Sequence, residues 1–592
     1  MIRMSNSGSI RNSDNYISAG IFFMIAFVYF CFIGNYALYF QETQSLFVFS
    51  SEYLHEHLMK PGAPLEYIAR FMTQFYYGEI TGSILLTLVL ALPAFILLKI
   101  DRRLMPGNFL SPAFIILPSV LLMLMQVNYY HMMEYNLGFV LIFTFYLLAV
   151  SLSEKMLIVT VLTLFPLFYF IAGAYALIFV VMYIVHNLLL EKKARRYIPS
   201  ILLLIVASLT FLISWKVVFL QPVEQFVLFP LPLFESVFYT LIFSLMAGCV
   251  IFYPLISRLG PRWKESRFNT RLYSNISSAI IYIVAIIGLS ALYNPQTARV
   301  IEMEKLVFRQ KWNEAVRFQE KHPSRNLIGQ YFYNIALSET DQLCDRLFTG
   351  GQDFGTGSLV LPWGDVHLNR GAYFYYAVGL INEAQRWAYE EMVVYGSRPQ
   401  NMELLAKTSL IKGDYVLAGK YINILKKTIY YRREAKEFER LANDPELIKT
   451  DPELGNKLRL IPRGNFFIQF NEPENNLPLI LASQPDNRKA FEYYIAELLL
   501  AKNVEAVINQ VKYMKGIGYT RIPRCIEEAI MIYFNSQRVY PDLGGLSISE
   551  ETATRFGRYF TNYIAARQAP STLKEKMQNQ FGDTFWYYYH FK

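Results

Sequence analysis

The residues of this chain that could do chemistry border its long apolar runs. Glu42, in FQETQ, directly follows the first run, so its carboxylate would face a site between a membrane and water. Lys216 lies within a later run, in FLISWKVVFL, where a cation is costly unless it reaches the interface or finds a partner. Reaching the interface is the simpler interpretation of Lys216, and anchoring the phosphates of a lipid carrier is the functional one.

Two pairs of polar residues fall between apolar runs. Glu66 and Arg70 are four residues apart and can pair on one helix face, either as an ordinary interfacial ion pair or as part of a site. His131 and Glu134, in NYYHMMEYN, are three residues apart and could share a helix face. For this second pair, the alternative is two solvated polar groups within an aromatic interfacial belt.

The apolar runs predict a transmembrane domain over residues 1–293. Of the 592 residues, 54% are hydrophobic, and residues 18–293 hold nearly all the long apolar runs. About 20 apolar residues are needed to cross the hydrocarbon core of a bilayer. Nine segments are candidate spans, the fifth and sixth joined by a tight hairpin near Gly173: 17–39, 80–100, 109–127, 135–153, 156–171, 173–190, 198–220, 236–257 and 275–293.

Basic residues predict the orientation of these spans. Fifteen Lys and Arg residues fall in alternate loops, which the positive-inside rule places in the cytoplasm, and only Lys60 and Arg70 fall in the opposite loops. We therefore expect a cytoplasmic N-terminus and an extracytoplasmic domain after Asn294. The same asymmetry accounts for the net charge of +9 without a nucleic-acid partner, and the chain has no zinc-finger, Walker or dinucleotide-binding pattern.

The segment between the first two spans is predicted to lie on the outer face. Apolar residues recur at helical spacing in 46–58 and in 65–77, and Pro61, Gly62 and Pro64 separate the two stretches. This pattern predicts two helices lying in the plane of the interface. They would either seal the outer surface of the membrane domain or roof a site.

Residues 294–592 predict an extracytoplasmic domain of helical repeats. Small residues recur after 34 positions, at Ala372, Gly379 and Ala384 and again at Ala406, Gly413 and Ala418. Small residues at close-packed positions and a glycine at the turn are typical of tetratricopeptide-like hairpins, and the alternative is a generic helical bundle. Cys344 and Cys525 also lie in this half, and nothing near them in the sequence supports a disulfide.

The predicted layout resembles the GT-C superfamily of polyprenyl-phosphate-dependent glycosyltransferases. The shared features are a cytoplasmic N-terminus, a long first outer loop with a carboxylate and interfacial helices, and a helical-repeat domain outside the membrane. The layout is similar to that of eukaryotic O-mannosyltransferases, which join such a membrane domain to tetratricopeptide repeats, and the sequence also resembles polytopic membrane proteins of Bacteroidota. A typical GT-C first loop has an Asp, often in an acidic pair, where this chain has Glu42.

This resemblance implies transfer of a sugar or glycan from a polyprenyl-linked donor to a periplasmic protein or glycan acceptor, in the bacterial inner membrane and in contact with its lipids. Glu42 would be the general base that activates the acceptor hydroxyl. Arg70 and Lys216 would bind the donor phosphate, with or without a divalent metal ion. Glu66, His131 and Glu134 would line the side of the site that binds the acceptor.

Two other classes of protein remain open. One is a non-catalytic membrane anchor that presents a helical-repeat scaffold for assembly of the cell envelope, although an anchor does not need nine spans. The other is a transporter or flippase, which would need charged residues in mid-membrane, and the apolar runs hold few.

Overall fold

The computed structural model describes residues 5–104, 109–152, 154–190, 197–259, 262–263, 268–469, 472–566 and 570–592. It divides into two compact units, unit 1 (1–294) and unit 2 (295–592), one residue from the predicted boundary. Both units are built from helices, so the predicted mainly α fold is confirmed. In the described part of the chain, strand structure is confined to β1 (Phe109–Leu110), which pairs antiparallel with β2 (Arg262–Trp263).

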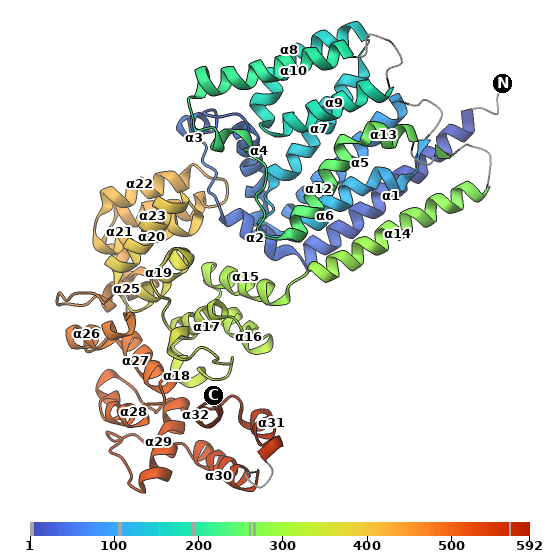
Figure 1. The fold of residues 1–592 in the computed structure, drawn as a ribbon. Helices are drawn as coiled ribbons and strands as arrows, with labels where there is room; N and C mark the ends of the chain where they lie inside the picture. Colours follow the sequence, from blue (N-terminus) through green and yellow to red (C-terminus); the bar gives the residue numbers. More distant parts are fainter. Residues whose placement is uncertain are drawn as a thin grey trace. The chain divides into compact units, whose positions relative to one another are not determined.

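Unit 1 has an apolar helix at each of the nine predicted segments (Figure 1). These helices are α1 (Ser5–Phe32) with α2 (Asn35–Thr43), α5 (Glu79–Leu104), α6 (Pro112–Met125), α7 (Met133–Ser151), α8 (Glu154–Ala172), α9 (Tyr175–Leu190), α10 (Tyr197–Ile213) with the π-helical η3 (Ser214–Phe219), α12 (Val237–Ile251) with α13 (Tyr253–Leu259), and α14 (Phe268–Leu292). The short α11 (Glu224–Val227) lies between η3 and α12.

Length and bending leave the count of nine spans unconfirmed. Among the described residues, four helices are long and apolar enough to cross a membrane, and six qualify if each bent pair is one span. The bent pairs are α1 with α2, at 69°, and α12 with α13, at 63°. Three more apolar helices are shorter, at Pro112–Met125, Val159–Ala172 and Tyr175–Leu189.

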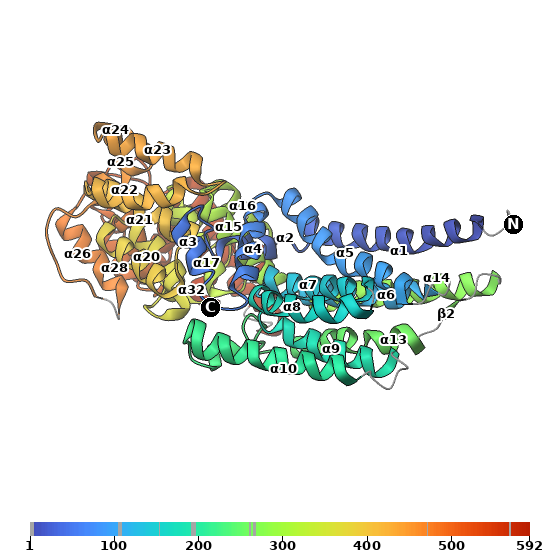
Figure 2. The same cartoon turned by 90° about the horizontal axis from the view of Figure 1, so that it is seen from above.

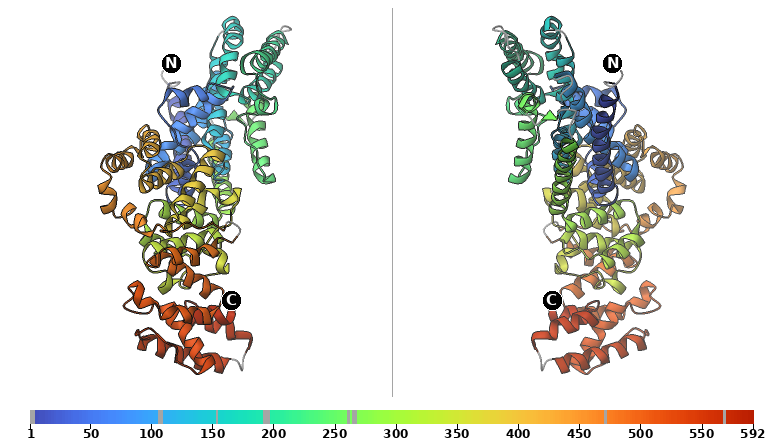
Figure 3. Two further views of the ribbon diagram at one scale, coloured as in Figure 1. Left: turned by 90° about the vertical axis from the view of Figure 1, so that its left-hand side faces the viewer. Right: turned by 90° about the vertical axis from the view of Figure 1, so that its right-hand side faces the viewer.

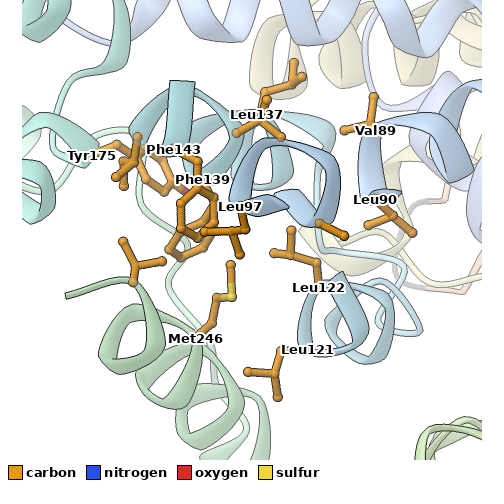
Figure 4. Packing of buried hydrophobic residues seen from close by; sticks show 14 of the residues in the cluster. Val89, Leu90, Leu97, Leu121, Leu122, Leu137, Phe139, Phe143, Tyr175 and Met246 are labelled. Atoms are coloured by element: carbon orange, nitrogen blue, oxygen red, sulfur yellow. The ribbon is translucent and has the colours of Figure 1, made fainter. Parts of the chain in front are cut away.

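The core of unit 1 is formed by helices that run side by side around α5 (Figures 1 and 2). Leu97 of α5, Phe139 of α7 and Met246 of α12 lie together in this core (Figure 4). By contrast, only 11% of the apolar window of Tyr197–Phe219 and 17% of that of Asn275–Leu292 are buried. Such exposed apolar faces are costly in water and are typical of helices that face lipid.

The segment between α2 and α5 is less helical than predicted. The stretch 46–58 holds only α3 (Ser51–Glu56), and the stretch 65–77 is covered by α4 (Ala63–Thr73) with the 3₁₀ turn η1 (Gln74–Tyr77). Before α3 the chain is instead fixed by aromatic packing, because the Phe47 ring centre lies 4.9 Å from that of Tyr67 and 5.5 Å from that of Phe71. The α3 helix begins where the Ser50 hydroxyl accepts a hydrogen bond from the Tyr53 amide.

Unit 2 consists of helical hairpins that follow one another along the chain (Figure 3). Its helices are α15 (Pro295–Phe308), α16 (Trp312–Lys321), α17 (Leu327–Glu339), α18 (Leu343–Arg346), α19 (Leu368–Ala377), α20 (Ile381–Tyr395), α21 (Pro399–Lys412), α22 (Tyr415–Lys426), α23 (Arg432–Asn443), α24 (Glu446–Thr450), α25 (Leu454–Leu460), α26 (Asn476–Ser483), α27 (Arg488–Leu500), α28 (Val504–Val511), α29 (Arg524–Gln537), α30 (Glu550–Ala566), α31 (Pro570–Phe581) and α32 (Phe585–Phe591). Short 3₁₀ turns are η4 (Gly355–Ser358), η5 (Asp365–His367), η6 (Pro473–Asn475) and η7 (Met514–Ile517).

The two turn glycines of the predicted repeat occupy equivalent places. Gly379 lies between α19 and α20 with φ +85°, and Gly413 lies between α21 and α22 with φ +76°. Both values belong to the left-handed region that favours glycine. The prediction that both glycines lie at turns between helices is therefore confirmed.

Candidate functional site

Glu42 lies on the short helix α2, which leaves the end of α1 at an angle of 69°. Its side chain is buried, as are its neighbours Gln41 and Thr43. The α2 helix packs against α5, η1 and α4, so Glu42 is enclosed by protein at the end of the apolar helices. Burial of a carboxylate is costly unless the site supplies polar partners.

A chain of hydrogen bonds that links four neutral polar residues begins beside Glu42. Gln41 Nε2 donates to the His131 backbone oxygen at 2.8 Å, and the His131 ring Nε2 lies 3.1 Å from Asn136 Oδ1. Asn136 Nδ2 in turn donates to Gln126 Oε1 at 2.7 Å. All four side chains are buried, and we call them the amide network. The network joins α2, the end of α6 and the beginning of α7.

The amide network retains unused hydrogen-bonding capacity. Gln41 Oε1, Gln126 Nε2 and His131 Nδ1 are buried and have no hydrogen-bond partner within the described part of the chain, as is the case for the Tyr76 hydroxyl of η1. Burial lowers the pKa of His131 to about 4, so its ring is neutral near pH 7. With Nε2–H donating to Asn136, the tautomer we infer, Nδ1 is an acceptor. The network thus offers two acceptors, one amide donor and one hydroxyl.

Glu66, Arg70 and Glu134 form a second group, which we call the ion cluster. Arg70 Nη2 donates to Glu66 Oε1, and Arg70 Nη1 lies 3.5 Å from the Tyr53 hydroxyl. Glu134, in the first turn of α7, interacts electrostatically with both Glu66 and Arg70. Arg70 therefore pairs directly with Glu66, and the Glu134 carboxyl lies within electrostatic range of both.

The predicted site residues are thus only partly brought together. The ion cluster unites Glu66, Arg70 and Glu134, and His131 joins α2 next to Glu42. His131 and Glu134 do not share a helix, since α7 begins at Met133, and His131 is wholly buried rather than solvated.

Lys216 lies apart from these buried groups. It is exposed on η3, with its ammonium nitrogen 3.7 Å from the centre of the Trp215 ring. Lys216 is therefore not a buried cation: it lies on a π-helical turn, and its ammonium makes a cation–π contact. The segment still approaches the outer loop, because Gln221 Nε2 donates to the Met59 oxygen at 3.2 Å.

The described residues give no support for a preformed metal site. Across them, no group of three or more His, Cys, Asp or Glu side chains is placed to hold a metal ion. His57 is buried, with its Nδ1 2.8 Å from the Tyr53 oxygen, whereas His55 is exposed.

Sequence reasoning missed a cavity of about 560 Å³ in unit 2. Residues of α15, α16, α17, α19, α20, α21, α25 and α27 line it, including the half-buried rings of Phe308 and Trp312. Lys407 on α21 is buried in its wall, 2.5 Å from Glu403 and 3.1 Å from Glu453. The repeat pattern could not show this cavity, because the pattern does not indicate which charged side chains of different helices come together.

Comparison with known proteins gives a family and no function. Residues 12–592 match the model of a family of unknown function, DUF6057. The chain belongs to this family. The match covers both units, so the DUF6057 family joins the apolar helices and the helical hairpins in one protein. No curated protein and no solved structure matches the chain.

Proposed function

We propose that the chain transfers a sugar or glycan from a polyprenyl-phosphate-linked donor to a periplasmic acceptor. The observation that supports this most is the burial of Glu42 beside the amide network, at the end of the apolar helices. A sugar hydroxyl both donates and accepts hydrogen bonds. The unused acceptors of Gln41 and His131 and the unused donor of Gln126 are complementary to such hydroxyls.

In this proposal each charged group of the site has a separate role. Glu42 is the general base for the acceptor hydroxyl, and Glu134 is the second carboxylate of the site. Arg70 binds the donor phosphate, which competes with Glu66 for the same guanidinium. Lys216, which is exposed beside Trp215, also binds this phosphate and reaches it from the lipid-facing surface.

The proposal also covers the number and orientation of the membrane spans and the repeat type of unit 2. The nine apolar helical segments cross the bacterial inner membrane with the N-terminus in the cytoplasm, and unit 2 is a periplasmic tetratricopeptide-like domain. The fifteen-to-two distribution of basic residues supports this orientation, although several of them, among them Lys192 and Lys193, lie outside the described residues. The repeated glycine turns support the repeat assignment.

A membrane-anchored binding scaffold is the second candidate. It is favoured by the cavity in unit 2, which has buried charged residues and aromatic walls and needs no chemistry from unit 1. Under this candidate, unit 1 serves only to hold unit 2 at the membrane.

Sugar transfer from polyprenyl-phosphate donors by the purified full-length chain separates the two candidates. Removing a general base costs about 10²- to 10⁴-fold in rate, so Glu42→Gln should lower transfer by that factor. Glu56→Gln changes an exposed carboxylate of the same outer segment and should leave transfer unchanged. Undiminished transfer by Glu42→Gln would remove Glu42 from the mechanism, and absence of transfer by the unaltered chain with any donor would favour the scaffold.

A further inference from the structure

The cavity of unit 2 has a charged wall to which the sugar-transfer proposal assigns no role. Lys407 is buried there between Glu403 and Glu453, and Glu453 Oε1 also accepts a hydrogen bond of 2.8 Å from the Tyr376 hydroxyl. Glu434 lies on α23, which packs against α21, and its carboxyl interacts with that of Glu403. We call these five residues the Lys407 cluster. It places three carboxyl groups around one ammonium.

The cluster holds a proton because it lacks a second cation. Two interacting carboxyl groups repel each other unless one of them holds a proton. Burial, together with the neighbouring Glu403 and Glu453, raises the pKa of Glu434 to about 8. Burial alone would also raise the pKa of Glu453, but Lys407, Gln310 and Tyr376 hold it below its usual range, so Glu453 is ionised.

The other cations that line the cavity are already occupied. Lys457 pairs with Glu339 at 2.6 Å, and Lys489 pairs with Asp341 at 2.7 Å. Arg488 pairs with Glu492 at 3.0 Å. An anionic ligand would therefore have to displace a carboxylate, except at the exposed rim where Arg459 lies.

The remaining walls favour an organic cation over an inorganic one. The rings of Phe308, Trp312 and Tyr373 line the same cavity as Glu403 and Glu453. Aromatic faces attract organic ammonium groups and bury the apolar carbons attached to them. The buried Oε1 of Gln400, which has no hydrogen-bond partner within the described residues, adds an acceptor to this cavity.

We propose that this cavity binds an organic ammonium group, of the kind carried by a lysine side chain or an amino sugar, against Glu403 and Glu453. The bound cation replaces the proton that Glu434 holds, and that proton passes to solvent. The proposal stands independently of sugar transfer, because it uses only residues of unit 2.

Calorimetry on the purified full-length chain tests the proposal. The probes are the tripeptide Gly-Lys-Gly and glucosamine, each compared with its N-acetylated form, and inorganic phosphate. A hydrogen bond to a charged group contributes about 1.5–3 kcal/mol, so acetylation should weaken binding at least about tenfold. Comparing the affinities of Gly-Lys-Gly and glucosamine shows whether the ammonium group comes from a peptide or from an amino sugar. Equal binding of the acetylated probes, tighter binding of phosphate, or no binding of either ammonium probe would overturn the proposal.

Two variants complete the test. Glu434→Gln reproduces the protonated carboxyl of the free protein, so it should fold normally but bind the ammonium probe more weakly and release no proton, as judged in buffers of different ionisation enthalpy. Glu446→Gln is the control, because Glu446 pairs with Lys449 on the exposed surface of α24. Equal affinity and equal proton release in Glu434→Gln and the unaltered chain would contradict the role of the Lys407 cluster.

Discussion

Gln41 donates its side-chain amide to the backbone oxygen of His131 at 2.8 Å, across 90 positions of sequence. Together with a weaker bond from the same nitrogen to the Tyr129 oxygen, at 3.3 Å, this bond joins the bent end of the first apolar segment to the turn before α7. It also links the residue next to Glu42 to the amide network, in which His131, Asn136 and Gln126 follow in order. The position of Glu42 therefore depends on a polar contact rather than on apolar packing alone.

Gln41→Leu should destabilise unit 1 by about 1–3 kcal/mol, because the His131 oxygen would lose its side-chain donor in a buried place. Gln44→Leu is the matched control, since Gln44 lies just after α2 and its Nε2 donates to the oxygen of Phe40, four residues earlier, at 3.3 Å. Thermal unfolding of the full-length chain in detergent compares the two variants. Equal losses would show that the bond to His131 adds no specific stability.

The ion cluster should show strong coupling between its members. Arg70→Met removes the cation that pairs with Glu66 and leaves the two acidic groups to repel each other, so it should cost more than Glu66→Gln, which removes one of them. In the double variant Arg70→Met/Glu66→Gln, part of the loss should be recovered, with a coupling energy of about 0.5–3 kcal/mol.

A double-mutant cycle measured by thermal unfolding gives this coupling energy. The exposed i,i+3 pair of Arg440 with Glu437 is the control and should couple by less than about 1 kcal/mol. If the losses of stability in the two single variants simply add in the double variant, Arg70 and Glu66 are not coupled and the ion cluster is contradicted.

The sequence predicted those features that depend on local spacing. The i,i+4 pair of Glu66 with Arg70 and the turn glycines at Gly379 and Gly413 follow from neighbours along the chain, and all are present. Helices likewise lie at the places where apolar runs predicted them. The bends and lengths of these helices could not be predicted from composition.

The features that sequence reasoning missed depend on contacts between distant segments. Gln41 and Gln126 are isolated amides at the ends of apolar runs, and nothing local indicates that they meet His131. Lys407 and Glu453 are 46 positions apart in the sequence and come together only when α21 packs against α25. A local signal was the spacing of Glu403 and Lys407, which are four residues apart and so share one helix face.

The two turn glycines should differ in their tolerance of a methyl group. Both have positive φ, so alanine at either place should cost about 1–2 kcal/mol. At Gly379 a Cβ atom would also lie 2.6 Å from the Leu460 backbone oxygen, whereas at Gly413 the nearest atom is 3.7 Å away. Gly379→Ala should therefore cost about 1–3 kcal/mol more than Gly413→Ala. Thermal unfolding of the two variants measures this difference, and equal losses would contradict the close packing of the first turn on Leu460.

Glu434 should make the stability of unit 2 depend on pH. Burial beside Glu403 and Glu453, only partly offset by Lys407, raises its pKa from 4.5 to about 8. Between these values the folded state holds a proton that the unfolded state has lost, so the free energy of unfolding should fall as pH rises.

Glu434→Gln removes this titration and isolates its effect. The variant should come closest to the unaltered chain below about pH 4, where the carboxyl is mostly protonated in both states, and should become the more stable protein by a growing margin as pH rises from 4.5 to 8. Thermal unfolding across this range is the measurement. A constant difference between the two proteins at all pH values would show that Glu434 is not protonated in the fold.

The proposed orientation can be tested with single cysteines. Cys31, Cys344 and Cys525 are buried and Cys249 is partly buried, so the native thiols should react slowly with a maleimide that cannot cross membranes. Glu56→Cys on α3 and Lys592→Cys at the end of unit 2 should both react in intact cells after the outer membrane is made permeable, because the positive-inside rule places both outside the cytoplasm. Arg102→Cys, at the opposite end of α5, should react only after the inner membrane is disrupted. Labelling of Arg102→Cys in intact cells, or protection of Lys592→Cys, would contradict the orientation and with it the periplasmic site of sugar transfer.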